Sequence, residues 1–85
     1  MDSFFWACRF QASATDINLL RDNLKFATAP VENMEFWNSR LEGDGNLDIS
    51  ITTNWCGYEL HDKDVHKYLF VNTNTSEAVF VFDEH

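Results

Sequence analysis

The groups best suited to chemistry lie between His61 and His66, where the chain reads HDKDVH. Metal sites use imidazoles and carboxylates of this kind. The spacing does not match a helical metal motif, however, and no cysteine lies close by in the sequence. We therefore expect a solvated, charged loop at this point, and a small metal-binding module is the weakest of the interpretations considered below.

A second group of oxygen ligands occupies the segment 42–48, which reads EGDGNLD. It places acidic or amide side chains at alternate positions, as the start of an EF-hand loop does. The pattern then fails, because Leu47 stands where that loop needs glycine and Thr53 where it needs a bidentate glutamate. We expect an acidic turn without bound calcium.

Nucleophilic catalysis and phosphate chemistry have little support. Cys8 and Cys56 lie among apolar neighbours, where we expect free, buried and unreactive thiols in a reducing compartment. The chain has only 3 glycines and contains no glycine-rich phosphate loop. The sequence therefore predicts a protein that is not an enzyme and that needs no cofactor.

The charge is unevenly distributed along the chain. The formal net charge is −8, and acidic and basic side chains balance as far as Ala27, so that the whole excess follows that residue. Such a surface repels nucleic acid and acidic membranes and attracts basic proteins. We expect no direct contact with nucleic acid or with a membrane.

The hydrophobic pattern predicts one domain, 1–85, with the element order β-α-β-β-β-β. The expected elements are strands over Phe4–Gln11, Val31–Leu41, Leu47–Trp55, Val65–Asn72 and Ala78–Asp83, a helix whose apolar stripe runs from Ile17 to Ala27, and a loop over Cys56–Asp64. Ser13 or Thr15 is expected to cap the helix. The fold class is therefore α+β: a two-layer arrangement with a mainly antiparallel sheet of four to five strands and one amphipathic helix on one face.

Ala78–Asp83 is apolar on both faces, and Phe4–Gln11 nearly so, which predicts that both strands are central and adjacent. A helix of about 12 residues cannot cover five strands. We therefore expect part of the opposite face to be solvated or covered by another molecule. The aromatic surplus, 8 Phe, 3 Trp and 2 Tyr, favours a covering molecule.

These features favour a small cytoplasmic binding protein that inhibits a basic partner, either a nuclease or another protein that binds nucleic acid. A small acidic domain can occupy the groove in which another protein holds nucleic acid, because its carboxylates lie where phosphates would. In type, as a small, acidic, aromatic-rich chain without catalytic motifs, this protein resembles immunity proteins of bacterial nuclease toxins and phage-encoded inhibitors of host defence. The alternative is a homodimeric interaction domain that pairs its uncovered sheet face or an edge strand. The residues expected to bind the partner are Glu42, Asp44, Asp48, Glu59, Asp62 and Asp64 for charge, with Trp37, Trp55 and Tyr58 as aromatic anchors.

Overall fold

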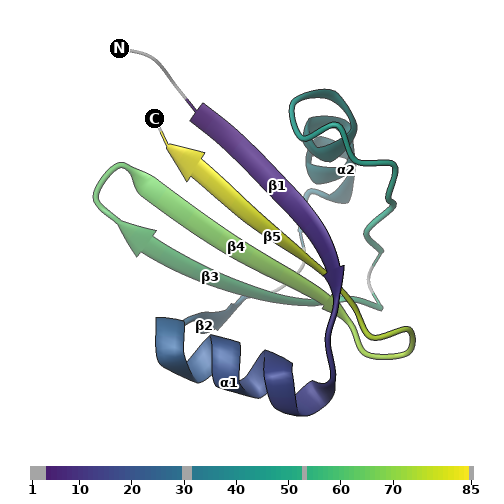
Figure 1. Cartoon of the computed structure of the whole chain (residues 1–85). Helices are drawn as coiled ribbons and strands as arrows, with labels where there is room; N and C mark the ends of the chain where they lie inside the picture. The colour runs from purple at the N-terminus through teal and green to yellow at the C-terminus, as the bar shows by residue number, and fades with distance from the viewer. Residues whose placement is uncertain (1–3, 30–31, 53, 85) are drawn as a thin grey trace.

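The computed structural model describes residues 4–29, 32–52 and 54–84. Within them the chain forms, in order, β1 (Phe4–Gln11), α1 (Ala14–Leu24), β2 (Ala27–Ala29), α2 (Met34–Gly43), β3 (Cys56–Asp62), β4 (Val65–Asn72) and β5 (Glu77–Glu84). The α+β class is confirmed, with a five-stranded antiparallel sheet and two helices in the described part of the chain (Figure 1). Neither helix is long and apolar enough to cross a membrane.

The strand order is β1-β5-β4-β3-β2, and every neighbouring pair is antiparallel. β5 lies between β1 and β4, and its Ala78, Val79 and Val81 are fully buried. This confirms the expectation of a central C-terminal strand beside Phe4–Gln11. β1 itself is an edge strand rather than a central one, because it pairs with β5 alone.

One face of the sheet packs against α1, which lies near the end at which β1 finishes (Figure 1). Ser13 caps this helix, since its hydroxyl accepts a hydrogen bond from the backbone N–H of Asp16 at 3.2 Å. Ile17 is buried against Leu69 and Ala78 of the sheet. The helix ends at Leu24, earlier than expected, because Lys25 takes the left-handed conformation with φ 58°.

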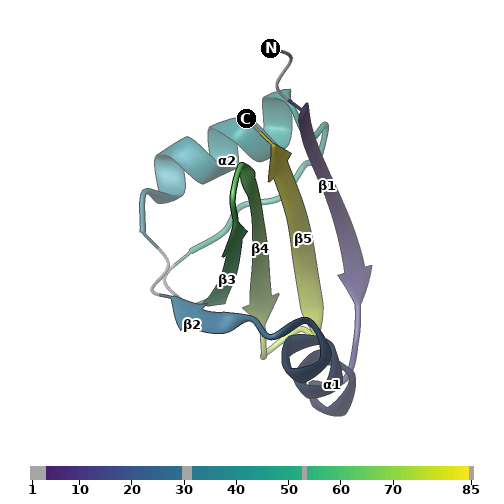
Figure 2. The same cartoon turned by 90° about the vertical axis from the view of Figure 1, so that its left-hand side faces the viewer.

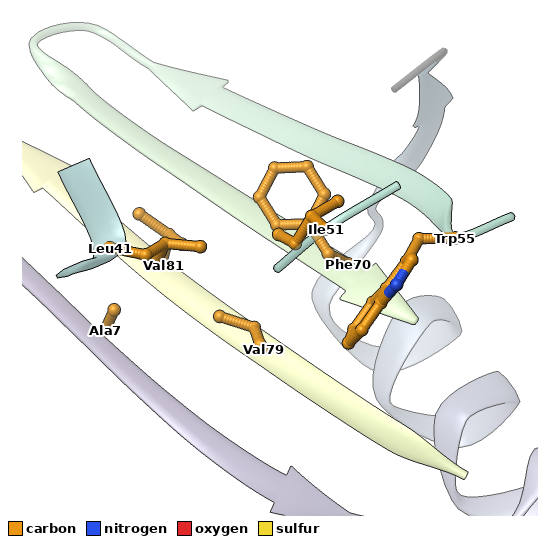
Figure 3. Close-up of a cluster of buried hydrophobic side chains, with 7 residues drawn as sticks. All are labelled: Ala7, Leu41, Ile51, Trp55, Phe70, Val79 and Val81. Atoms are coloured by element: carbon orange, nitrogen blue, oxygen red, sulfur yellow. The ribbon is translucent and has the colours of Figure 1, made fainter. Parts of the chain in front are cut away.

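The other face packs against α2 and the irregular segment that follows it (Figure 2). Leu41 of α2 lies beside Val81, and Ile51 and Trp55 from the irregular segment belong to the same buried cluster as Phe70 (Figure 3). Leu41 and Ile51 are 0% and 1% exposed, respectively. The face opposite α1, which we expected to be partly uncovered, is therefore covered by this chain's own residues.

The strand predicted over Val31–Leu41 is wrong: Met34–Gly43 is helical, and Val31 lies outside the described residues. Helical spacing explains the adjacent aromatics that gave no clean strand face. Trp37 and Leu41, four residues apart, share the side that meets the sheet, whereas Phe36 is 47% exposed. The strand prediction failed because adjacent aromatic residues, one buried and one exposed, are as compatible with a helix as with a strand.

The strand predicted over Leu47–Trp55 is also wrong, since the described residues there are irregular and Thr53 lies outside them. The alternating pattern did mark the residues that turn inward, because Leu47, Ile49 and Ile51 all pack on the core. The backbone of Ile51 is hydrogen-bonded by a side chain rather than by a neighbouring strand. Asn38 of α2 donates to the Ile51 carbonyl at 3.1 Å and accepts from the Ile51 N–H at 2.7 Å.

The predicted loop Cys56–Asp64 is instead β3 and the first residues of a tight turn into β4. Lys63 takes a left-handed conformation there, with φ 56°. Both cysteines are free, as expected, but Cys56 is exposed and Cys8 half-buried, so the expectation of two buried thiols was wrong. β3, which the sequence pattern did not predict, forms with β4 the hairpin on which the candidate site is built.

Candidate functional site

A pocket of about 210 Å³ lies between the first turn of α2 and the β3–β4 hairpin. Its lining includes Glu32, Asn33, Trp37, Tyr58, Glu59 and Tyr68. The register of the hairpin builds one side, because Glu59 pairs with Tyr68 and strand alternation turns both side chains to the α2 face. The helix supplies the other side through Trp37.

Trp37 is held among other aromatic rings. Its ring centroid lies 4.6 Å from that of Tyr68 and 5.4 Å from that of Phe70, both in edge-to-face geometry. The exposed Phe36 stacks on it at 5.3 Å. Such contacts fix the orientation of the indole, so the pocket has a rigid aromatic wall before any partner arrives.

The charge at the pocket is negative. Glu32 is exposed and Glu59 half-buried, and the residues that line the pocket include no lysine, arginine or histidine. Burial of the ring raises the pKa of Tyr68 above its ordinary value of 10.0, and the charges of Asp83 and Glu59 raise it further. The same carboxylates that resist a tyrosinate there would stabilise a bound cation.

His61 and His66, which we expected in a solvated, charged loop, are instead strand residues that face each other across the hairpin. His61 pairs with His66, and their ring centroids are 4.3 Å apart. The Nε2 atom of His61 lies 3.2 Å from a carboxylate oxygen of Glu59, an ion pair when the imidazole is protonated. Within residues 4–29, 32–52 and 54–84, no group of three or more His, Cys, Asp or Glu side chains is placed to hold a metal ion.

The chain already binds one cation in the manner that the pocket would require. The guanidinium carbon of Arg40 lies 4.2 Å from the centre of the Phe5 ring and 5.7 Å from that of Phe36. Carboxylates complete its surroundings, with Asp44 at 2.7 Å and Asp83 at 3.8 Å. Aromatic rings and carboxylates therefore surround and stabilise a guanidinium elsewhere in this protein.

The structure brings Trp37 and Glu59 of the predicted partner-binding residues together at the pocket. Tyr58 contributes to the lining, but its side chain belongs to the α1 face, where Arg21 lies 5.6 Å from the ring centre. Trp55 is 7% exposed and packs in the core, so its ring is not a surface anchor. The other five predicted acids are exposed and lie outside the pocket, at the end of α2 or after it, at the end of β3 and in the turn into β4: Glu42, Asp44, Asp48, Asp62 and Asp64.

Sequence reasoning missed Glu32, Asn33 and Tyr68. The signal that could have identified Tyr68 was the hairpin itself, because a two-residue turn at Lys63 and Asp64 pairs Glu59 with Tyr68 directly. Asn33 shows no strand or helix pattern, since it is the residue in left-handed conformation, φ 54°, that precedes α2. Comparison with protein-family models, with curated proteins and with solved structures found no match to this chain.

Proposed function

We propose that this protein binds and inhibits a basic, nucleic-acid-handling protein in the cytoplasm by receiving one of its arginine or lysine side chains in the pocket beside Trp37. The supporting observation is the composition of that pocket. Two aromatic rings, Trp37 and Tyr68, and two carboxylates, Glu32 and Glu59, face a space that the lining leaves without a positive charge.

The size of the pocket favours a single side chain over a free small molecule. Pockets for drug-sized ligands measure roughly 300–1,000 Å³, and this one measures about 210 Å³. A guanidinium is planar and stacks on aromatic faces while it donates to carboxylates, so arginine suits the pocket better than lysine does. The rigid wall formed by Trp37 reduces the entropy lost on binding.

The exposed carboxylates outside the pocket act at longer range. Glu42, Asp48, Asp62 and Asp64 are exposed, and a surface of this sign steers a basic partner toward the pocket and raises the rate of association. A domain that covers the basic groove of a nuclease would exclude the nucleic acid from it. Inhibition then follows from occupancy, without any chemistry by this chain.

The pocket is tested with N-acetyl-arginine amide as a probe in a ¹H–¹⁵N NMR titration. Binding should shift the indole signal of Trp37, and the uncharged analogue N-acetyl-citrulline amide should leave it in place. Glu59→Gln should weaken binding about threefold to tenfold, because one partly exposed charge pair is lost. Glu42→Gln, at an exposed acid outside the pocket, is the matched control and should bind as the wild type does.

The partner is tested by capture from the lysate of the cells that encode the protein, followed by assay of the captured protein on labelled DNA and RNA. Wild type should block nucleic-acid binding or cleavage, and Glu59→Gln should do so less well. Combining Glu42→Lys with Asp62→Lys should lower the association rate by about tenfold at low salt, with a smaller change at ~1 M salt. If the arginine probe shifts no signal near Trp37, or if Glu59→Gln binds it equally well, the proposal is refuted.

A further inference from the structure

The outer edge of β1 is a long strand edge with no neighbour in the described residues. β1 pairs with β5 on one side only, and no other strand lies beyond it (Figure 2). The opposite edge of the sheet is β2, which has only 3 residues against the 8 of β1. The N–H and C=O groups along such an edge are ready to pair with another strand.

β1 has none of the features that usually protect an edge. Exposed edges are ordinarily blunted by proline, by a bulge or by several charges. Residues 4–11 contain no proline, and their register with β5 runs without interruption from Phe4 opposite Glu84 to Gln11 opposite Glu77. Their single charge belongs to Arg9, which already pairs with Glu77 at 2.8 Å.

The same strand carries two of the most exposed aromatic side chains in the described part of the chain. Phe4 is 54% exposed and Trp6 47% exposed, and strand alternation places both on the same face of β1 as Phe10, which packs against the cluster on the α1 side. Both rings contact half-buried rings of β5: the ring centroids are 5.9 Å apart for Phe4 and Phe82 and 6.2 Å apart for Trp6 and Phe80. This aromatic surface continues directly to the edge.

Charge indicates what pairs with this edge. A second copy of a chain with net charge −8 is repelled by most of the first copy's surface. Residues 4–11 carry no carboxylate, and the nearby Asp44 is already held by Arg40 at 2.7 Å. We propose that two copies of this chain pair through their β1 strands, antiparallel and related by a twofold axis, so that one sheet continues across both. This inference does not depend on the pocket.

The register of the pairing follows from the side chains. Residues paired across the axis must face the same side of the sheet, so the axis passes beside one residue that meets its own copy. Centring on Ala7 would set Arg9 opposite Phe5 of the second copy. The guanidinium carbon of that copy's Arg40 already lies 4.2 Å from the centre of the Phe5 ring, so this register would bring two positive charges together. Centring on Cys8 sets Trp6 opposite Phe10 of the second copy and brings the two Cys8 residues together.

The Cys8-centred register is tested by oxidation with diamide, which takes two electrons and two protons from a pair of thiols as they join. Opposed residues in antiparallel strands have Cα atoms about 4.5–5.5 Å apart, a distance that a disulfide spans. Cys56→Ser should give a dimer linked through Cys8. Cys8→Ser is the matched control, and it should cross-link much less although Cys56 is the more exposed thiol.

Molar mass by light scattering at about 100 μM chain provides an independent measurement. Wild type should be a dimer that persists at ~1 M salt, because backbone hydrogen bonds and aromatic contacts are not screened. Trp6→Glu should be a monomer, and Leu19→Glu, at a residue of α1 that is 56% exposed, should remain a dimer. Circular dichroism confirms that each variant is folded.

Any of four outcomes would overturn the inference. Wild type could be a monomer at this concentration, Trp6→Glu could remain a dimer, or oxidation could link the chains through Cys56 in preference to Cys8. A Trp6→Glu chain that fails to fold leaves the cross-linking result to decide, because that experiment keeps Trp6. A dimer that dissociates at high salt would also count against pairing through this uncharged edge.

Discussion

Replacing Leu41 with alanine tests whether α2 is held on the sheet as the structure describes. Leu41 is 0% exposed, is the only fully buried residue of α2, and packs against Ala7 and Val81. Truncation to alanine removes the isobutyl carbons beyond Cβ, which at ~0.8 kcal/mol for each buried carbon gives about 2.4 kcal/mol. The cavity left behind adds to this, for a total loss of about 3–4 kcal/mol in the free energy of unfolding.

The loss is measured by urea denaturation followed by circular dichroism. A domain of this size has a total stability of roughly 5–10 kcal/mol and an m-value of about 1 kcal/mol/M, so the midpoint should fall by about 3 M. Glu42→Ala, at the exposed neighbouring position, should change stability by less than about 0.5 kcal/mol. A loss below about 1 kcal/mol for Leu41→Ala would refute the packing of α2, and with it the wall of the pocket.

Two further predictions concern the turn after α2 and the tyrosine of the pocket. Gly45→Ala should destabilise the fold by about 1–3 kcal/mol, because its Cβ would lie 2.9 Å from the Leu41 carbonyl oxygen and 3.3 Å from the Ala7 side chain. Gly43→Ala, whose Cβ would have nothing within 4 Å, should be neutral or slightly stabilising. Equal effects of the two substitutions in thermal melts would contradict this prediction. The raised pKa of Tyr68 means that the folded state holds the phenolic proton more tightly than the unfolded state does, so stability should fall as pH rises above 10.0. In Tyr58→Phe protein, which keeps Tyr68 as the single tyrosine, absorbance at the tyrosinate band should titrate above the ordinary range, and an ordinary titration would show that the ring is solvated.

The parts of the fold that the sequence predicted are those in which local pattern and tertiary role agree. β5 is apolar on both faces because it has a strand on either side and packed residues above and below. The apolar pattern of Ala78–Asp83 predicts this central position. The cap at Ser13 and the register of α1 follow from short-range chemistry alone. β1 was read correctly as a strand, but not as an edge, because an unprotected edge has the same apolar pattern as a central strand.

The parts that could not be predicted depend on long-range pairs. Leu47–Trp55 alternates as a strand does, yet Asn38 rather than a strand satisfies the Ile51 backbone, and no local pattern reports a side-chain partner 13 residues away. Only some residues of the candidate site could be predicted, for the same reason. Trp37 and Glu59 were selected for their types, but what joins them is the packing of α2 against a hairpin that sequence reasoning had taken for a loop.

The placement of β5 between β1 and β4 has a consequence for how the chain is made. β1 is synthesised before β5, and its only partner in the described sheet is a segment roughly seventy residues later, so the strand stays unpaired until residues 77–84 have been synthesised. During that interval Phe4 and Trp6 have no folded surface beneath them, which is the condition in which nascent chains aggregate or recruit chaperones. Chains truncated before Glu77 should therefore be protease-sensitive, and protection should appear once residues 77–84 are included.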